Sequence, residues 1–231
     1  MSTHTKHKFL EAFQHVPIYG ITSKKDAPHR TVYDIVRDML ESGIRVVQYR
    51  EKETTGLERY KECLTLRKLT YDYGALLLID DFVDLALAVK ADGVHIGQDD
   101  LPPEQVRKLL GPKAIIGLST HSIEQLERAN ALVDCIDYIG VGPVFTTKTK
   151  PNASAVGLEY VQYARQHSQL PFVAIGGIKT NTIQSVFDAG ASIVCVVSEL
   201  VSARSMEDKI HELIHELMES KHKLMEHTFY E

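Results

Sequence analysis

The chain has 231 residues, of which 44% are hydrophobic, so its length fits one large domain or two small ones. Its 26 basic and 31 acidic side chains leave a formal net charge of -5, which argues against a general binder of nucleic acid or of anionic membranes. The three widely spaced cysteines are typical of a protein of the reducing cytosol. We find no signal-peptide core and no apolar run of ~20 residues, so the sequence predicts a cytoplasmic protein without a membrane span.

Short apolar runs recur along the whole chain. They are rich in β-branched residues and show little alternation, which is typical of parallel strands that are buried on both faces. In chain order the predicted strands cover residues 16–22, 44–49, 75–79, 93–96, 114–119, 138–142, 172–176 and 193–197.

Helical patterns lie between these runs. Residues 30–43 carry apolar side chains on one face and end at Gly43, and residues 181–192 repeat the pattern with Gly190. Strands alternating with helices predict an α/β fold, a single-domain (β/α)8 TIM barrel over residues 1–231, with a doubly wound open sheet as the alternative. We expect a short N-terminal extension over about residues 1–15 and a C-terminal helix and tail over about residues 206–231.

Polar side chains follow the predicted strands, where a barrel gathers its active residues. Gln48, Arg50 and Lys52 stand at period two, so their side chains point the same way in an extended segment. Aspartates follow the next two strands, at 80–81 and 99–100. Cations and carboxylates at one mouth indicate a polyanion with Mg²⁺ between them. The alternatives are solvated charges in the first case and helix N-caps in the second.

Two further segments suggest anion binding. The segment "VFTTKTKPNAS" (144–154) holds three threonines and two lysines but no acid. Glycine-rich "AIGGI" (174–178) and "VVSEL" (196–200) end the last two strands, where barrels often form a phosphate site. The pairing of the two segments favours phosphate binding over the alternative of tight turns. The zinc-protease pattern "HELIH" (211–215) lies on the predicted outer helix, and we interpret it as a solvated helix face.

Five motifs together resemble the thiamine phosphate synthase family. They are "VQYREK", "DDFVDLALAVKADGVHIGQDD", "GLSTHS", "DYIGVGPVFTTKTKP" and "AIGGI", and the resemblance covers roughly residues 16–220. It implies a (β/α)8 barrel that joins hydroxymethylpyrimidine pyrophosphate to hydroxyethylthiazole phosphate and releases pyrophosphate. Analogy with the family also suggests a homodimer.

The resemblance implies a role for individual residues. It places Mg²⁺ on Asp81 and Asp100. It assigns the pyrimidine pyrophosphate to Gln48, Tyr49, Arg50, Glu51, Lys52, Asp80, Ser119 and Lys150. It assigns the thiazole phosphate to Thr147, Thr149, Gly177, Val197 and Ser198, and it includes Lys148 in the binding loop, with its ammonium expected in solvent. The residues that it implies for catalysis are Arg50, Lys52, Ser119 and Lys150. The family usually has asparagine at the position of Asp80.

Catalysis would then consist mainly of charge neutralisation and positioning. The aminopyrimidine stabilises a methylene cation when the carbon–oxygen bond breaks, so no strong base is required. Two alternatives remain: a thiazole tautomerase, for which His121 would be the general base, and a non-enzymatic barrel that binds a phosphorylated ligand.

Overall fold

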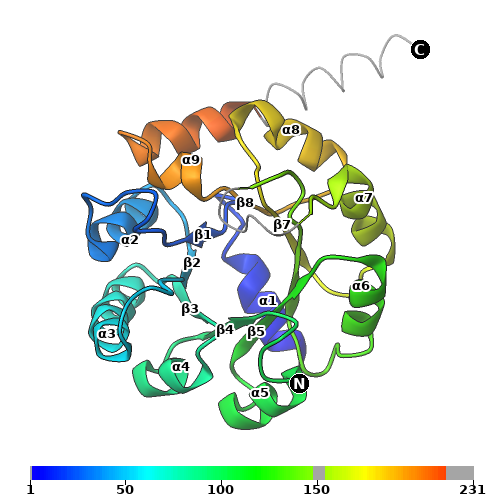
Figure 1. The fold of residues 1–231 in the computed structure, drawn as a ribbon, viewed down its shortest axis with the longest axis horizontal. Coiled ribbons are helices and arrows are strands. Elements are labelled where there is room, and N and C mark those ends of the chain that lie inside the picture. The colour runs from blue at the N-terminus through cyan, green and yellow to red at the C-terminus, as the bar shows by residue number, and fades with distance from the viewer. Residues whose placement is uncertain (1, 148–153, 217–231) are drawn as a thin grey trace.

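The computed structural model describes residues 2–147 and 154–216. Eight parallel strands pair in sequence order, as Figure 1 shows. They are β1 (Gly20–Ile21), β2 (Val46–Tyr49), β3 (Leu76–Asp80), β4 (Gly93–Ile96), β5 (Ile115–Thr120), β6 (Tyr138–Val141), β7 (Phe172–Ile175) and β8 (Val194–Cys195). A parallel bridge between Ile18 and Val194 joins the first and last strands and closes the ring. The predicted barrel is confirmed.

The first and last strands are shorter than the predicted ranges 16–22 and 193–197. Around the bridge, the Tyr19 backbone nitrogen donates to Val194 and the Val194 nitrogen donates to Pro17. These bonds join the two edges of the sheet, but the regular ladder of each edge strand is only two residues long.

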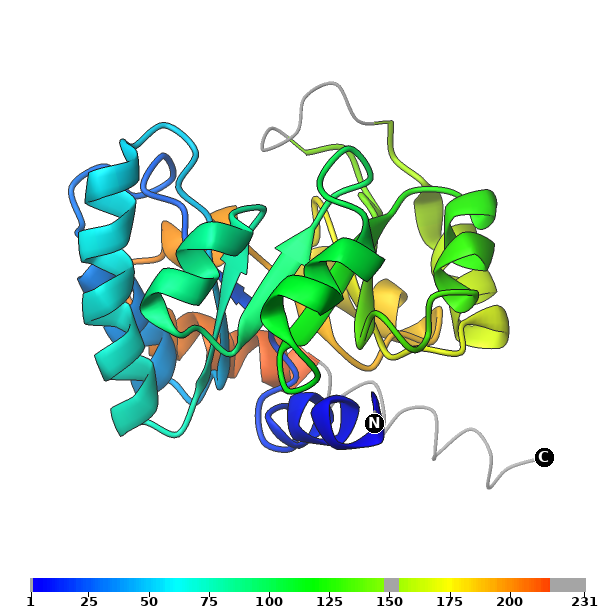
Figure 2. The same cartoon turned by 90° about the horizontal axis from the view of Figure 1, so that it is seen from below.

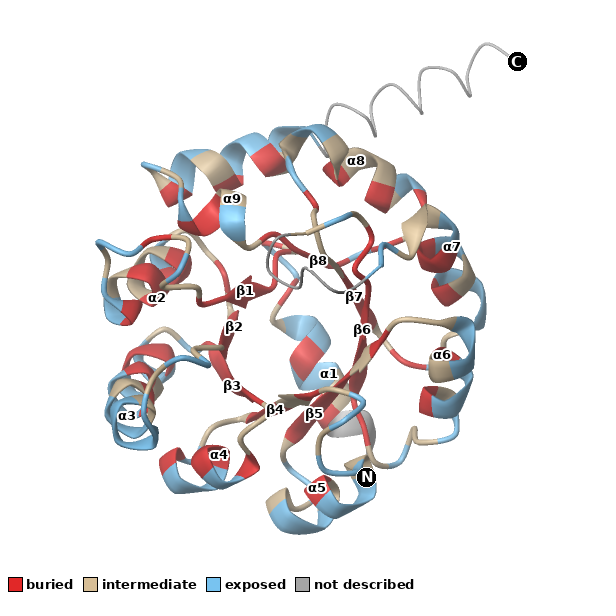
Figure 3. Cartoon of the chain, in the orientation of Figure 1, coloured by how far each residue is buried: buried red, intermediate tan, exposed pale blue. Residues whose placement is uncertain are grey.

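Helices form the outer ring, and each turns its buried face toward the strands (Figure 3). They are α2 (Val32–Glu41), α3 (Gly56–Asp72), α4 (Val83–Val89), α5 (Pro103–Leu110), α6 (Ile123–Asn130), α7 (Gly157–His167), α8 (Thr180–Asp188) and α9 (Ser198–Val201). Residues 206–216 are helical as well. Helix α2 follows the sequence signals: the Thr31 hydroxyl caps its first turn, and Gly43 adopts a φ of +92° just after its end.

Two apolar layers flank the strands. The larger one fills the space between strands and helices, and the smaller one fills the barrel interior. On β2, Val46 faces the interior and Val47 faces the helices, because successive side chains of a strand point to opposite faces. Both faces are therefore buried, which explains the continuous apolar runs of the sequence.

Helix α1 (Ser2–Glu11) covers the amino-terminal end of the barrel, as Figure 2 shows. Phe9 is fully buried, and its ring stacks on Tyr138 in the barrel interior with 4.2 Å between the ring centroids. Phe13 is also buried and stacks on Tyr19. At the surface, the Lys8 ammonium lies 2.9 Å from a carboxylate oxygen of Asp92. The segment expected to be an extension is thus the floor of the barrel.

We expect Phe9→Ala to lower the free energy of unfolding by about 3–5 kcal/mol, because it removes a buried ring and leaves a cavity beneath Tyr138. Urea or guanidinium unfolding measures the change. Leu10→Ala is the matched control, since the Leu10 side chain on the same helix is 43% exposed. A loss below about 1 kcal/mol for Phe9→Ala would contradict the docking of α1.

Candidate active site

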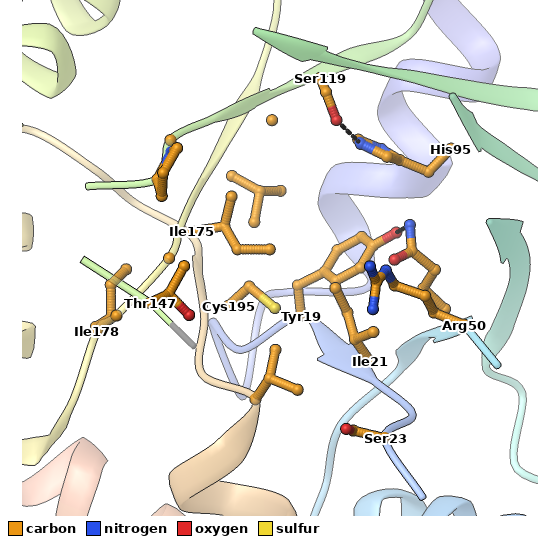
Figure 4. Close-up of a pocket in the computed structure, with 18 of the residues that line it drawn as sticks. Tyr19, Ile21, Ser23, Arg50, His95, Ser119, Thr147, Ile175, Ile178 and Cys195 are labelled. Atoms are coloured by element: carbon orange, nitrogen blue, oxygen red, sulfur yellow. Dashed lines mark hydrogen bonds between the residues drawn. The ribbon is translucent and has the colours of Figure 1, made fainter. Parts of the chain in front are cut away.

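A pocket opens at the carboxyl ends of the strands (Figure 4). Helix α1 lies at the other end of the barrel (Figure 2). Several strands contribute to its lining, which is the usual place for an active site in this fold. Of the residues singled out in the sequence, the following line it: Gln48, Arg50, Asp80, Ser119, His121, Thr147, Gly177, Val197 and Ser198.

The end of β2 and the end of β3 place cations beside carboxylates. Because β2 and β3 pair in parallel register, Arg50 and Asp80 come from neighbouring strand ends. The Arg50 Nε lies 3.4 Å from the Asp80 Oδ2, and the Lys52 Nζ lies 3.5 Å from the same oxygen. The Lys52 ammonium also lies 2.6 Å from the Asp81 Oδ2. The carboxylate at position 80 thus holds two cations at the mouth of the barrel.

Two residues of the same segment point elsewhere. The Tyr49 side chain is buried in the layer between the strands and the helices, where its hydroxyl donates to Glu62 of α3 at 2.6 Å. The Glu51 carboxylate accepts a hydrogen bond from the Lys24 backbone nitrogen at 3.0 Å. Strand alternation sends these two side chains away from Gln48 and Arg50. Neither residue is among those that line the pocket, and the substrate contact at Tyr49 and Glu51 stays a prediction.

Asp81 and Asp100 do not act as helix caps. The N-cap positions of α4 and α5 are Phe82 and Pro102, and neither makes a side-chain capping bond among the described residues. Asp81 adopts a φ of +62°, in the left-handed region that few non-glycine residues visit. Asp100 instead accepts a hydrogen bond from the Gly97 backbone nitrogen at 2.6 Å. The conformation of the loop after β3 thus sets the position of the Asp81 carboxylate, and that of the loop after β4 sets the position of the Asp100 carboxylate.

The two carboxylates lie close enough to affect each other. Burial raises the pKa of the Asp100 carboxyl, and the neighbouring Asp81 carboxylate raises it further. Such crowding of negative charge is relieved by a cation, and the Lys52 ammonium already lies against Asp81. The donor set fits Mg²⁺, which binds proteins through one or two carboxylates and completes its shell with phosphate oxygens and water. In the described part of the chain, no group of three or more His, Cys, Asp or Glu side chains is placed around a metal position.

The loop after β7 brings its backbone to the pocket wall. Gly177 has a φ of +66°, and a Cβ atom there would lie 2.7 Å from the Thr146 carbonyl oxygen. Gly176 has a φ of +101°, and a Cβ atom there would lie 2.4 Å from the Pro143 Cβ. Only glycine fits at these positions, so this loop can pack closely against the loop after β6. Ser198 lines the pocket beside this loop.

Some predicted site residues lie outside the described residues: Lys148, Thr149 and Lys150. On the outer helix, His211 and His215 are exposed while Leu213 between them is buried, as expected for a solvated helix face.

Several pocket residues were not predicted. Tyr19 and Tyr138 belong to apolar runs and read as ordinary core residues, yet both line the pocket. His95 also lines it, and its ring links the Tyr138 hydroxyl to the Ser119 hydroxyl. Strand alternation in the sequence could have identified Tyr138 as a pocket residue, because it places Tyr138 on the same face of β6 as Gly140 and Gly142.

Comparison with known proteins shows the family of the chain. Residues 18–200 match the family model described as thiamine monophosphate synthase. The chain belongs to the thiamine monophosphate synthase family. A thiamine-phosphate synthase from Caldicellulosiruptor bescii is 49% identical over 90% of this chain and 95% of its own length. One from Pelotomaculum thermopropionicum is 47% identical over 88% of this chain and 93% of its own.

A solved structure agrees with the assignment to the thiamine monophosphate synthase family. The thiamine phosphate pyrophosphorylase from Pyrococcus furiosus is 36% identical and superposes with a TM-score of 0.78, covering 87% of this chain and 95% of that one. The resemblance that the sequence motifs indicate is thus confirmed. The family model begins at residue 18, so helix α1 lies outside the matched region.

Proposed function

We propose that the chain is a Mg²⁺-dependent thiamine-phosphate synthase. It condenses 4-amino-5-hydroxymethyl-2-methylpyrimidine pyrophosphate with hydroxyethylthiazole phosphate, and it releases pyrophosphate. Membership of the family and the names of its relatives support the overall reaction. The observation that carries the assignment to this pocket is the position of Arg50 and Lys52 beside the paired carboxylates at the mouth of the barrel.

The leaving pyrophosphate would lie between these two sets of charges. Asp81 and Asp100 would hold the Mg²⁺ ion, which supplies positive charge to the pyrophosphate oxygens when it is bound. The Arg50 guanidinium offers a planar fork for phosphate oxygens, and the Lys52 ammonium adds a mobile point charge. Lys150 is the third cation that we propose for this group. Asp80 keeps Arg50 and Lys52 oriented before the substrate enters.

The second substrate would lie on the opposite wall. Its phosphate would lie against the backbone of Gly177 and the hydroxyl of Ser198, with Val197 beside them. Thr147 lines the pocket and would contact this substrate. Thr149 lies outside the described residues, and its contact stays a prediction. Gln48 and Ser119 also line the pocket and would hold the pyrimidine ring.

These positions suit a reaction in which the carbon–oxygen bond to pyrophosphate breaks before the thiazole nitrogen attacks. The chain's residues bind both substrates in line and neutralise the charge that grows on the leaving oxygen. A tautomerase would need a general base, and His121 does line the pocket with its Nδ1 2.5 Å from the Gly142 carbonyl oxygen. That reaction has no pyrophosphate, however, and gives Arg50 and Lys52 no role.

Incubation of the protein with both substrates and Mg²⁺, followed by detection of thiamine phosphate and pyrophosphate, tests the proposal. Formation of both products in equal amounts is expected. Tight binding of the substrates without product would support the ligand-binding alternative instead. The homodimer and the cytoplasmic location stay predictions, and none of the helices in the described residues is both long and apolar enough to cross a membrane.

We expect Asp80→Asn to keep kcat within about tenfold of the wild type, or about 1.4 kcal/mol of barrier. An asparagine oxygen can still accept hydrogen bonds from Arg50 and Lys52, so the orientation of both cations is retained. Steady-state kinetics with the pyrimidine substrate measures the change. A hundredfold loss would show that the carboxylate itself is essential, and a gain would show that its charge opposes pyrophosphate binding.

A further inference from the structure

A chain of hydrogen bonds runs beneath the candidate active site, from β2 through the barrel interior to β5. The Gln48 Nε2 donates to the Tyr19 hydroxyl at 3.3 Å, and this hydroxyl lies 2.8 Å from that of Tyr138. The Tyr138 hydroxyl lies 2.9 Å from the His95 Nδ1, and the His95 Nε2 lies 2.9 Å from the Ser119 Oγ. Figure 4 shows the last of these contacts. Both ends of the chain, Gln48 and Ser119, line the pocket.

With a neutral imidazole at His95, the protons in this chain can be arranged in two ways only. Burial raises the pKa of Tyr19 well above its usual value, and burial likewise raises that of Tyr138, so both phenols keep their protons. Each contact then needs one proton, and a neutral imidazole donates from one nitrogen and accepts at the other. An uninterrupted series of bonds must therefore point either from Gln48 to Ser119 or from Ser119 to Gln48.

The orientation of Gln48 selects the first direction. Its amide nitrogen can only donate, so the Tyr19 oxygen accepts. The proton of Tyr19 then goes to Tyr138, and that of Tyr138 goes to the His95 Nδ1. The His95 proton lies on Nε2 and is donated to Ser119. In consequence, Ser119 presents its hydroxyl proton to the pocket, and the amide oxygen of Gln48 presents an acceptor.

Close packing holds the rings in place. A Cβ atom on Gly117 would lie 2.2 Å from the Tyr138 Cζ and 2.5 Å from the His95 Nδ1. One on Gly140 would lie 3.3 Å from the His95 Cε1. Glycines on β5 and β6 thus make room for the histidine–tyrosine pair, and Phe9 of α1 stacks on Tyr138 from below. Few other positions are open to these rings, so the distances between the members of the hydrogen-bond chain are held as well.

We propose that Tyr19, His95 and Tyr138 are positioning residues that make the pocket select a 4-aminopyrimidine over a 4-oxopyrimidine. The proposal rests on the proposed function, which places the pyrimidine between Gln48 and Ser119. In the amino form, the exocyclic group donates and the adjacent ring nitrogen accepts. The oxo form reverses both roles. One fixed acceptor and one fixed donor match the amino form and oppose the oxo form, and a buried mismatch of this kind is strongly rejected.

The test compares the binding of two non-reacting ligands, the 4-amino and the 4-oxo hydroxymethylpyrimidine monophosphates, by calorimetry. The wild type should bind the amino ligand at least about tenfold more tightly. Tyr138→Phe and Tyr19→Phe each remove one hydroxyl from the chain of hydrogen bonds while keeping the ring. The Gln48 amide and the Ser119 hydroxyl can then exchange their donor and acceptor roles. The preference for the amino ligand should then fall by about tenfold. Thermal melting of each variant shows that it remains folded.

Tyr160→Phe is the matched control. The Tyr160 hydroxyl is a buried hydrogen-bond donor to Thr120 of the same strand β5, but on the helix side of the barrel. This variant should keep the preference of the wild type. An unchanged preference in both Tyr138→Phe and Tyr19→Phe, or a wild type that prefers the oxo ligand, would overturn the proposal. Failure to form thiamine phosphate while the preference shifts as expected would overturn the proposed function alone.

Discussion

Asp100→Asn is expected to lower kcat by about 10²–10³, because it weakens the binding of the Mg²⁺ ion that we propose stabilises the charge of the leaving group. The asparagine oxygen can still accept the bond from the Gly97 nitrogen, so the loop should keep its shape while the carboxylate charge is lost. With one charged ligand fewer, the variant should need more Mg²⁺ and recover part of its activity when the metal concentration is raised. A titration of kcat against Mg²⁺ for both proteins measures this.

Asp99 provides the control for this prediction. It is adjacent in the chain and carries the same charge, but its side chain is exposed. Asp99→Asn should therefore leave the Mg²⁺ titration unchanged. Wild-type activity that persists in excess EDTA would show that the paired carboxylates serve no metal, and so would an Asp100→Asn variant with unchanged kinetics.

Arg50→Ala should also lower kcat by about 10²–10³, or about 2.7–4 kcal/mol of barrier, because it removes a guanidinium of the pocket lining that we propose faces the leaving pyrophosphate. The charge on that oxygen grows as the bond breaks, so kcat should fall more than KM for the pyrimidine substrate rises. Arg50→Lys keeps the charge without the planar fork and should lose less activity. Steady-state kinetics with both variants separates charge from geometry.

Arg50→Ala could also lower kcat through Asp80, because the Asp80 carboxylate would then have only one of its two cations, Lys52, beside it. The double variant Arg50→Ala with Asp80→Asn removes that charge as well. If it recovers wild-type kcat, Arg50 acts only by balancing Asp80 and does not serve the substrate. Arg37→Ala, on the surface of α2, is the control for the loss of a cation far from the pocket and should be neutral.

Most of the site geometry follows from strand order. Since parallel strands pair in sequence order, residues after consecutive strands become neighbours, and this alone predicts that Arg50 meets Asp80. Period two in an extended segment predicts that Gln48 and Arg50 share a face. The same rule places the side chains of Tyr49 and Glu51 on the other face of the segment. Their assignment came from the family resemblance, which marks a stretch of chain and not individual side chains.

Other features depend on packing between segments that lie far apart in the sequence, and local sequence patterns do not predict this packing. Phe9 and Phe13 are four residues apart in a polar segment, and their burial depends on the open end of the barrel that they cover. Tyr19 and Tyr138 have an apolar body and a polar tip, so an apolar run hides the hydroxyl contact between them. The left-handed conformation of Asp81 likewise results from the loop that surrounds it.

Helix α1 affects where the chain can be shortened. A fragment cut to the region that the family model matches would begin at residue 18 and would lack Phe9 and Phe13. Water would then reach the rings of Tyr19 and Tyr138 from the amino-terminal end of the barrel, and apolar surface would be left exposed. Expression of such a fragment would be expected to yield aggregated protein, although every residue that lines the active-site pocket would still be present.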